Sequence, residues 1–209
     1  MVVHDHPHRR TGSRLLSVRR SRTTSEPEST PPESTHNDGK RGYAMASLRL
    51  MMGFVFLWAF LDKAFGLGYA TPSGRGWISG GSPTEAFLGR VAVGPMESTF
   101  HSWAGAAWAD WLFMLGLLGI GLALTAGVAL RLAALAGTVM MALMWVAEWP
   151  PARHLSDGAP SMSTNPLVDY HLVYAAVLVV LAAASAGDAV GLGRPWSRLP
   201  VVRDRMWLR

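Results

Sequence analysis

Four long apolar stretches, separated by polar or glycine- and proline-rich segments, dominate the chain from residue 46 onward. They cover residues 46–65, 111–130, 132–147 and 172–187. The first two are about as long as the hydrocarbon core of a bilayer is thick, and the last two reach that length with their flanking residues. Soluble core helices rarely stay apolar on every face over such a length. The pattern therefore predicts an all-α, integral membrane four-helix bundle.

The N-terminal part of the chain has a different amino-acid composition. Residues 1–45 are rich in Arg, Ser, Thr, Pro and Glu and contain few large apolar side chains. Such a segment buries too little surface to offset its ordering entropy, so we expect a disordered tail. This divides the chain into a basic tail (1–45), a membrane domain (46–189) and a basic C-terminal tail (190–209). An alternative translation start at Met45 stays open.

The basic residues indicate an orientation. The chain has a net charge of +5, although only 16% of its residues are charged. Lys and Arg concentrate in the two tails, whereas loops 66–108 and 149–167 contain few of them. By the positive-inside rule, and with an even number of spans, both termini are expected on the cytoplasmic side. The charge excess therefore indicates membrane lipids as partners, and we expect no binding of nucleic acid.

Two loops contain helix-start signals. Ser82-Pro83-Thr84-Glu85 combines a capping residue, proline at the first helical position and a glutamate that can complete a capping box. We expect a short helix there, lying at the outer membrane interface. Asn165-Pro166 similarly predicts the start of the fourth long helix. A stripe of small residues predicts close packing against the second long helix, and its members are Gly119, Ala123 and Gly127.

The predicted topology brings polar residues from separate segments to one membrane level. The first and third helices end on the outer side, where the second and fourth begin. Acidic and basic candidates for catalysis then meet there, namely Glu148, Asp62, His171 and Lys63. Candidates for binding a cofactor surround them, namely Trp145, Trp149, Tyr170, Asp169, Asp110 and Trp111.

Each of these residues also has a structural explanation. Asp110 and Asp169 fall in first turns, where the helix dipole favours an acid. The tryptophans fit an interfacial aromatic belt, and Lys63 can reach water along its own stem. Asp62 and Glu148 fit such explanations less well, because the dipole at a helix C-terminus disfavours a negative charge. An acid placed there needs a partner, and this favours a functional site at the outer ring.

Several chemistries are disfavoured. The chain has no cysteine, which removes disulfides, thiolate metal sites and thiol relays. We expect no haem, because His171 is the only histidine on a predicted span. We also expect no nucleotide, because there is no phosphate-binding or dinucleotide motif. No metal site is expected either, although His4, His6 and His8 in the tail can bind a metal weakly. A quinone headgroup suits the ring best, because it needs hydrogen-bond donors and a proton route.

Five blocks of sequence carry a family resemblance. They are FLWAFLDKAFGLGYAT (56–71), GGSPT (80–84), WADWLFMLGLLGIGLAL (108–124), MWVAEWPPA (144–152) and NPLVDYH (165–171). The chain from 56 to 196 resembles the DoxX family of bacterial membrane proteins, and in particular the DoxD-like subunit of thiosulfate:quinone oxidoreductase. The resemblance implies a four-helix bundle in the bacterial cytoplasmic membrane. It suggests a redox subunit that passes electrons from thiosulfate or a related sulfur donor to quinone.

Two other functions stay open. The chain can be a non-catalytic scaffold that holds a redox or oxidative-stress enzyme, as a partner protein or second subunit, at the membrane. The missing cysteines, haem ligands and nucleotide motifs favour that alternative. Transport of a small solute through the bundle is a weaker one, since the middle of the predicted spans contains no row of charged residues.

Overall fold

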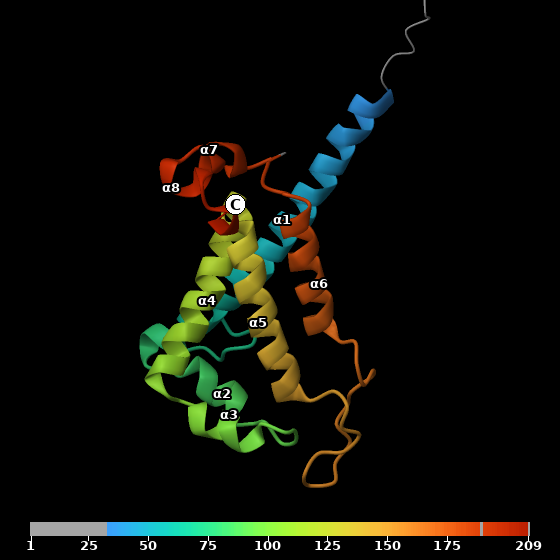
Figure 1. Ribbon diagram of the computed structural model, residues 1–209. Coiled ribbons are helices and arrows are strands. Elements are labelled where there is room, and N and C mark those ends of the chain that lie inside the picture. Colours follow the sequence, from blue (N-terminus) through green and yellow to red (C-terminus); the bar gives the residue numbers. More distant parts are fainter. Residues whose placement is uncertain (1–32, 189, 209) are drawn as a thin grey trace, which may run out of the picture. The chain divides into compact units, whose positions relative to one another are not determined.

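From residue 33 onward, every regular element that the structure describes is a helix. The structure is a computed structural model, and it describes residues 33–188 and 190–208 (Figure 1). Within these residues, the only extended pairing is an isolated bridge between His154 and Pro160. The elements are α1 (Glu33–Phe65), η1 (Trp77–Ser79), α2 (Pro83–Leu88), α3 (Glu97–Trp103), α4 (Ala107–Ala126), α5 (Leu130–Glu148), α6 (Tyr170–Ala183), α7 (Gly193–Ser197), α8 (Pro200–Arg203) and η2 (Met206–Leu208).

Three of the described helices are long and apolar enough to cross a membrane. They are the Gly39–Phe65 part of α1, together with α4 and α5. Helix α6 has 14 residues, which at 1.5 Å per residue extends over about 21 Å, less than the ~30 Å of a hydrocarbon core. The fourth spanning helix was predicted over 172–187, but the helix observed there is shorter. The chain leaves the helical conformation after Ala183, and Ser185 adopts a φ of 48°.

Four helices nevertheless share one core. Helix α1 packs on α4, α4 on α5 and α5 on α6. The large buried side chains at their junction come from all four helices: Met52, Phe56, Met114, Leu117, Ile120, Leu124, Met141, Leu178 and Leu181. This arrangement fixes the end of α5 beside the start of α6, and that junction carries the candidate site (Figure 1).

The contact between α1 and α4 depends on glycine. A Cβ added to Gly121 of α4 would lie 2.7 Å from Leu57 Cγ and 2.9 Å from Leu57 N of α1. Gly53 of α1 faces Thr125 in the same way, with Thr125 Oγ1 at 2.6 Å from its built Cβ. A Cβ at Gly119 would meet nothing within 4 Å. The small-residue stripe predicted on 119, 123 and 127 is therefore on the wrong face at Gly119, since Gly121 makes the close approach.

We expect Gly121→Ala to lower stability and Gly119→Ala to leave it unchanged or raise it slightly. The added methyl at Gly121 forces Leu57 and its backbone away, which typically costs about 1–3 kcal/mol. The same methyl at Gly119 is exposed, and alanine is the better helix former by roughly 1 kcal/mol. Chemical unfolding in detergent micelles, followed by circular dichroism, measures both. Equal losses at the two positions would contradict the helix contact.

The ends of the helices differ from their predicted positions. Helix α4 covers 107–126 rather than 111–130, because Gly127 ends it with a φ of 75°. Ala129 also has a positive φ, of 49°, and α5 begins directly after it at Leu130. The turn is itself apolar (Gly-Val-Ala), so hydropathy alone did not separate it from the helices.

The helix starts in the two loops have different outcomes. Helix α2 begins as predicted: Pro83 is its first residue, and the Ser82 hydroxyl accepts the backbone N–H of Glu85. The predicted start at Asn165-Pro166 is wrong. The Asn165 side chain accepts the N–H groups of Leu167 and Val168, which closes a local turn. Asp169 caps α6 instead, and its carboxylate accepts the N–H of Leu172.

Both terminal segments contain helix. Helix α1 begins at Glu33, so residues 33–45 are helical, whereas the predicted disordered tail extends to residue 45. Extending an existing helix adds a hydrogen bond for each residue fixed, which explains how it continues past the apolar segment. The rest of the predicted tail, residues 1–32, lies outside the described residues. At the other end, α7, α8 and η2 fold back on one another, and the Trp196 indole donates to the Leu208 carbonyl at 2.6 Å.

Candidate functional site

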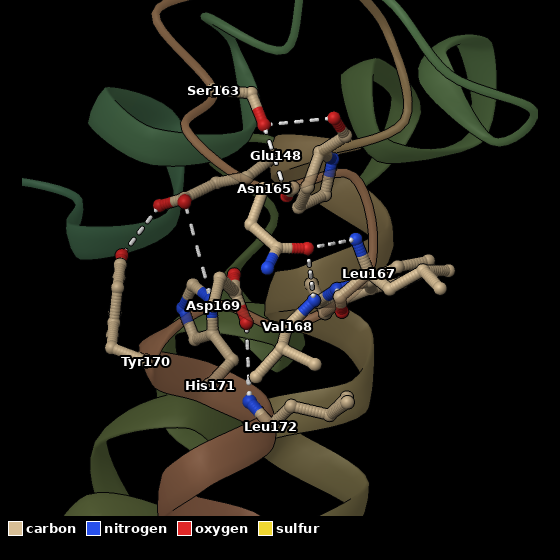
Figure 2. Close-up of polar contacts among 11 residues, drawn as sticks. Glu148, Ser163, Asn165, Leu167, Val168, Asp169, Tyr170, His171 and Leu172 are labelled. Carbon is tan, nitrogen blue, oxygen red and sulfur yellow. Dashed lines mark hydrogen bonds and ion pairs between the residues drawn. The ribbon is translucent and has the colours of Figure 1, made fainter.

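A cluster of four polar side chains lies where α5 ends and α6 begins. Glu148 is the last residue of α5, and Asp169 is the N-cap of α6, followed by Tyr170 and His171. The loop of residues 149–168 separates them in sequence, but packing of α5 on α6 brings them together. Figure 2 shows the four side chains pointing toward one another from the two helices. We refer to Glu148, Asp169, Tyr170 and His171 as the α5–α6 cluster.

Short polar contacts hold the α5–α6 cluster. The Tyr170 hydroxyl donates to Glu148 Oε1 at 2.7 Å. His171 Nδ1 lies 2.8 Å from Asp169 Oδ2 and 4.0 Å from Glu148 Oε2 (Figure 2). Asp169 Oδ1 accepts the N–H of Leu172, so each carboxylate uses one oxygen for a neighbour and directs the other toward the imidazole.

Burial differs across the cluster. The His171 side chain is fully buried, while the side chains of Asp169 and Glu148 are 15% and 38% exposed. His171 Nε2 is buried without a hydrogen-bond partner among the described residues. Within the described part of the chain, the polar contacts of the imidazole are therefore those with the two carboxylates on its Nδ1 side. A proton can pass from the surface to the ring through groups in contact.

A cavity of about 500 Å³ with a mixed polar and apolar lining opens beside the α5–α6 cluster, and we refer to it as the polar cavity because its polar groups distinguish it from a second cavity. Glu148, Asp169 and Tyr170 form part of its wall, and Arg90 and Asn165 contribute from the two loops. The Asn165 oxygen already accepts two backbone N–H groups, so its amide nitrogen is left to donate. The cavity thus combines carboxylates with hydrogen-bond donors, which suits a polar headgroup.

A second, apolar cavity of about 350 Å³ lies between α2, α3, α4 and α5. Its lining is almost entirely aliphatic and aromatic, and includes Phe113, Met140, Leu143 and Met144. Phe87 of α2 lines both this cavity and the polar one. A polar and an apolar space therefore adjoin across one side chain.

Asp62 and Lys63 are not bonded to the α5–α6 cluster in the described residues. No hydrogen bond or ion pair in the described part of the chain joins either of them to Glu148, Asp169 or His171. Asp62 is buried, and its Oδ1 accepts the N–H of Tyr69 at 3.2 Å, which stabilises the turn after α1. The other oxygen of Asp62 is buried without a partner among the described residues. In the described residues, no polar contact thus joins Asp62 or Lys63 to the other members of the predicted ring.

Asp110, predicted as a candidate for binding a cofactor, is bonded to residues at the start of α2. Its Oδ1 accepts the Ser82 hydroxyl at 2.9 Å, the Thr84 N–H at 2.9 Å and the Thr84 hydroxyl at 2.6 Å. These contacts attach α2 to the first turn of α4. Trp111, next to it, packs edge-on against Trp77 with ring centroids 4.6 Å apart. Both residues therefore hold the segment between α1 and α4 rather than the α5–α6 cluster.

The two tryptophans near Glu148 frame the end of α5. The Trp145 indole donates to the Leu167 carbonyl at 3.1 Å, which ties α5 to the chain before α6. Trp149 has a positive φ of 42° and ends the helix, with its ring 5.6 Å from that of Trp145. Neither side chain lines the two cavities, so their position supports a framework role.

Sequence reasoning missed several residues of the site. Phe87, Arg90 and Asn165 line the polar cavity but were not candidates. The available signal was the density of Ser, Thr and Asn in the loop of residues 149–168, which exceeds what a plain connection needs. The three ligand-type atoms of Glu148, Asp169 and His171 also lie within 4.8 Å of one another, which is a metal-like grouping that the sequence did not indicate.

Comparison of the chain with known proteins does not assign it to a family. No family model, no curated protein and no solved structure matches the chain.

Proposed function

We propose that the protein is a DoxX-like integral membrane protein of the bacterial cytoplasmic membrane that binds a quinone. Helices α1, α4 and α5 cross the bilayer in this proposal, and α6 with its flanking residues completes a four-helix bundle. Both termini then lie on the cytoplasmic side, as the basic residues of the tails favour. Membrane lipids surround the bundle. The three apolar helices of sufficient length support the membrane location.

One observation carries the proposal: a polar and an apolar cavity adjoin at Phe87. A quinone has the same division, with a headgroup that accepts hydrogen bonds and a long apolar tail. Arg90 and Asn165 line the polar cavity and can donate to the headgroup carbonyls. The apolar cavity between α4 and α5 can take the first part of the tail, which then continues into lipid.

The α5–α6 cluster suits the proton side of quinone reduction. A quinone becomes a quinol by taking up two electrons and two protons. Glu148 lines the cavity, accepts from Tyr170 and faces His171, so it can exchange a proton with bound headgroup and surface. The electrons come, in this proposal, from thiosulfate or a related sulfur donor that is oxidised by a second subunit or redox partner protein.

We expect a short-tailed quinone such as decylubiquinone to bind the full chain in lipid nanodiscs, and Leu143→Trp to weaken binding at least tenfold. The tryptophan fills the apolar cavity that Leu143 lines. Leu135→Trp is the matched control, since Leu135 is an exposed position on the same helix outside the cavity. Isothermal titration calorimetry measures both affinities.

Two results of this titration would overturn the proposal. One is no quinone binding by the unaltered chain, and the other is equal binding by the Leu143 and Leu135 variants. If a redox enzyme co-purifies from native membranes while quinone does not bind, the scaffold function is the better explanation. The exposed Arg194 and Arg198 near the C-terminus would then be the first surface to test for the partner.

A further inference from the structure

We propose that Glu148, Asp169 and His171 bind one divalent first-row transition metal ion, of the Mn²⁺ to Zn²⁺ series, at the junction of α5 and α6. The proposal is independent of quinone binding. It rests on the charge of the α5–α6 cluster, on the distances within it and on the cavity beside it.

No lysine or arginine of the described residues is paired with the two carboxylates of the cluster. Both carboxylates face the Nδ1 side of a fully buried imidazole. Carboxylates that converge in a partly buried place repel one another unless a positive charge lies between them. A bound divalent ion provides that charge.

The distances suit a metal ion with little movement. Ligand atoms about 2.1 Å from an ion and at near-tetrahedral angles lie about 3.4 Å apart. His171 Nδ1 is 2.8 Å from Asp169 Oδ2 and 4.0 Å from Glu148 Oε2, so the two distances bracket that value. All three ligand atoms lie within 4.8 Å of one another (Figure 2). Rotation of the partly exposed Glu148 side chain is enough to close the set.

The two carboxylates are already oriented by their neighbours. Tyr170 holds Glu148 Oε1, and the Leu172 N–H holds Asp169 Oδ1. Each acid therefore directs its second oxygen at the cluster. Hydrogen bonds of this kind fix first ligands in natural metal sites and raise their affinity.

The site has room for further ligands. Glu148 and Asp169 line the polar cavity of about 500 Å³, so water or a small anion can complete the coordination. One imidazole and two carboxylates form an intermediate-to-hard donor set that suits Zn²⁺, Mn²⁺ or Co²⁺ better than Cu⁺ or an iron–sulfur cluster. Three protein ligands with an open position are typical of a reactive rather than a closed structural centre.

The test measures zinc binding by the full chain in lipid nanodiscs after treatment with a chelator. His4, His6 and His8 are changed to glutamine in every sample, because the histidines of the tail can hold zinc themselves. Zinc per chain is counted by mass spectrometry after desalting, and the affinity is measured by competition with a chromophoric chelator. The visible absorption of bound Co²⁺ gives a second, independent readout.

We expect one zinc ion per chain, and at least 30-fold weaker binding in His171→Asn and Glu148→Gln. The matched controls His154→Asn and Asp157→Asn change exposed residues of the outer loop and should bind as the parent does. Circular dichroism and gel filtration confirm that each variant is folded. The Glu148 variant keeps the test valid if His171→Asn does not fold, since Glu148 is partly exposed.

The proposal is overturned if the parent chain retains no zinc, or if the Glu148 and His171 variants bind zinc and Co²⁺ as the parent does. Quinone is absent from this assay. A failure here therefore leaves the quinone titration unaffected, and a failure of that titration leaves the metal site unaffected.

Discussion

Replacing Arg49 with methionine is expected to destabilise the protein by roughly 3–5 kcal/mol, enough to unfold much of it. Arg49 is only 1% exposed, and its guanidinium makes the contacts that matter. It donates to the carbonyl of Leu124, to that of Thr125 at 2.9 Å and to that of Val190 at 2.6 Å. These bonds satisfy the C-terminal end of α4, where the helix dipole also favours a cation. Methionine fills similar space but leaves the carbonyls of Leu124, Thr125 and Val190 without this donor, and Leu124 is buried.

Unfolding in mixed detergent micelles, followed by circular dichroism, measures this loss. Arg49→Lys should fall between the parent and the methionine variant, because an ammonium keeps the charge but lacks the planar fork that reaches several carbonyls. Arg75→Met is the control, since Arg75 is exposed, and it should change stability by less than about 0.5 kcal/mol. If the Arg49 and Arg75 variants unfold alike, Arg49 does not hold the end of α4.

The sequence predicted the long helices well but not their ends. Hydropathy reports which residues avoid water, and α1, α4 and α5 each correspond to one apolar stretch. It says little about where the backbone turns when the turn is also apolar, as at Gly127 and Ala129. The end of α6 was missed for the same reason. Residues 184–187 are small (Ala-Ser-Ala-Gly) and continue the uncharged stretch, yet Ser185 has a positive φ there.

The candidate site was predicted in part, and the reason lies in what topology can specify. Helix order and direction place Glu148 and His171 near one level, and the structure brings them within 4.0 Å. Helix order and direction do not specify which way a side chain faces around its helix. Asp62 therefore turned out to be bound to the Tyr69 N–H, and Asp110 to α2. Arg49, near the start of the first apolar stretch, lies buried against the end of α4, which hydropathy does not indicate.

Asp110 shows how a correct local explanation can be incomplete. As an acid in the first turn of α4, it benefits from the helix dipole, and this alone predicts a small effect of mutation. The structure adds three hydrogen bonds to one carboxylate oxygen, from Ser82 and Thr84. The dipole contribution is therefore the smaller one, because each hydrogen bond to a charged group contributes about 1.5–3 kcal/mol when buried.

Asp110→Ala is consequently expected to lower stability by roughly 3–4 kcal/mol. It removes the shared acceptor and leaves the buried N–H of Thr84 without its partner. Helix α2 then loses its attachment to α4. Because Phe87 of α2 lines both cavities, quinone affinity should fall with stability. Unfolding in detergent and the quinone titration in nanodiscs measure the two effects.

Two variants separate the hydrogen bonds from the charge. Asp110→Asn keeps one oxygen for the three donors and removes only the charge, so it should lose less than half as much stability as the alanine variant. Ser82→Ala removes one of the three donors and one cap of α2, at a cost of about 1 kcal/mol. If the asparagine variant is as unstable as the alanine variant, the charge of Asp110 contributes more to stability than its hydrogen bonds. The interaction with the helix dipole is then the better explanation. If the alanine variant keeps both its stability and its quinone affinity, the hydrogen bonds of Asp110 do not hold α2. Apolar contacts alone are then sufficient to keep Phe87 between the two cavities.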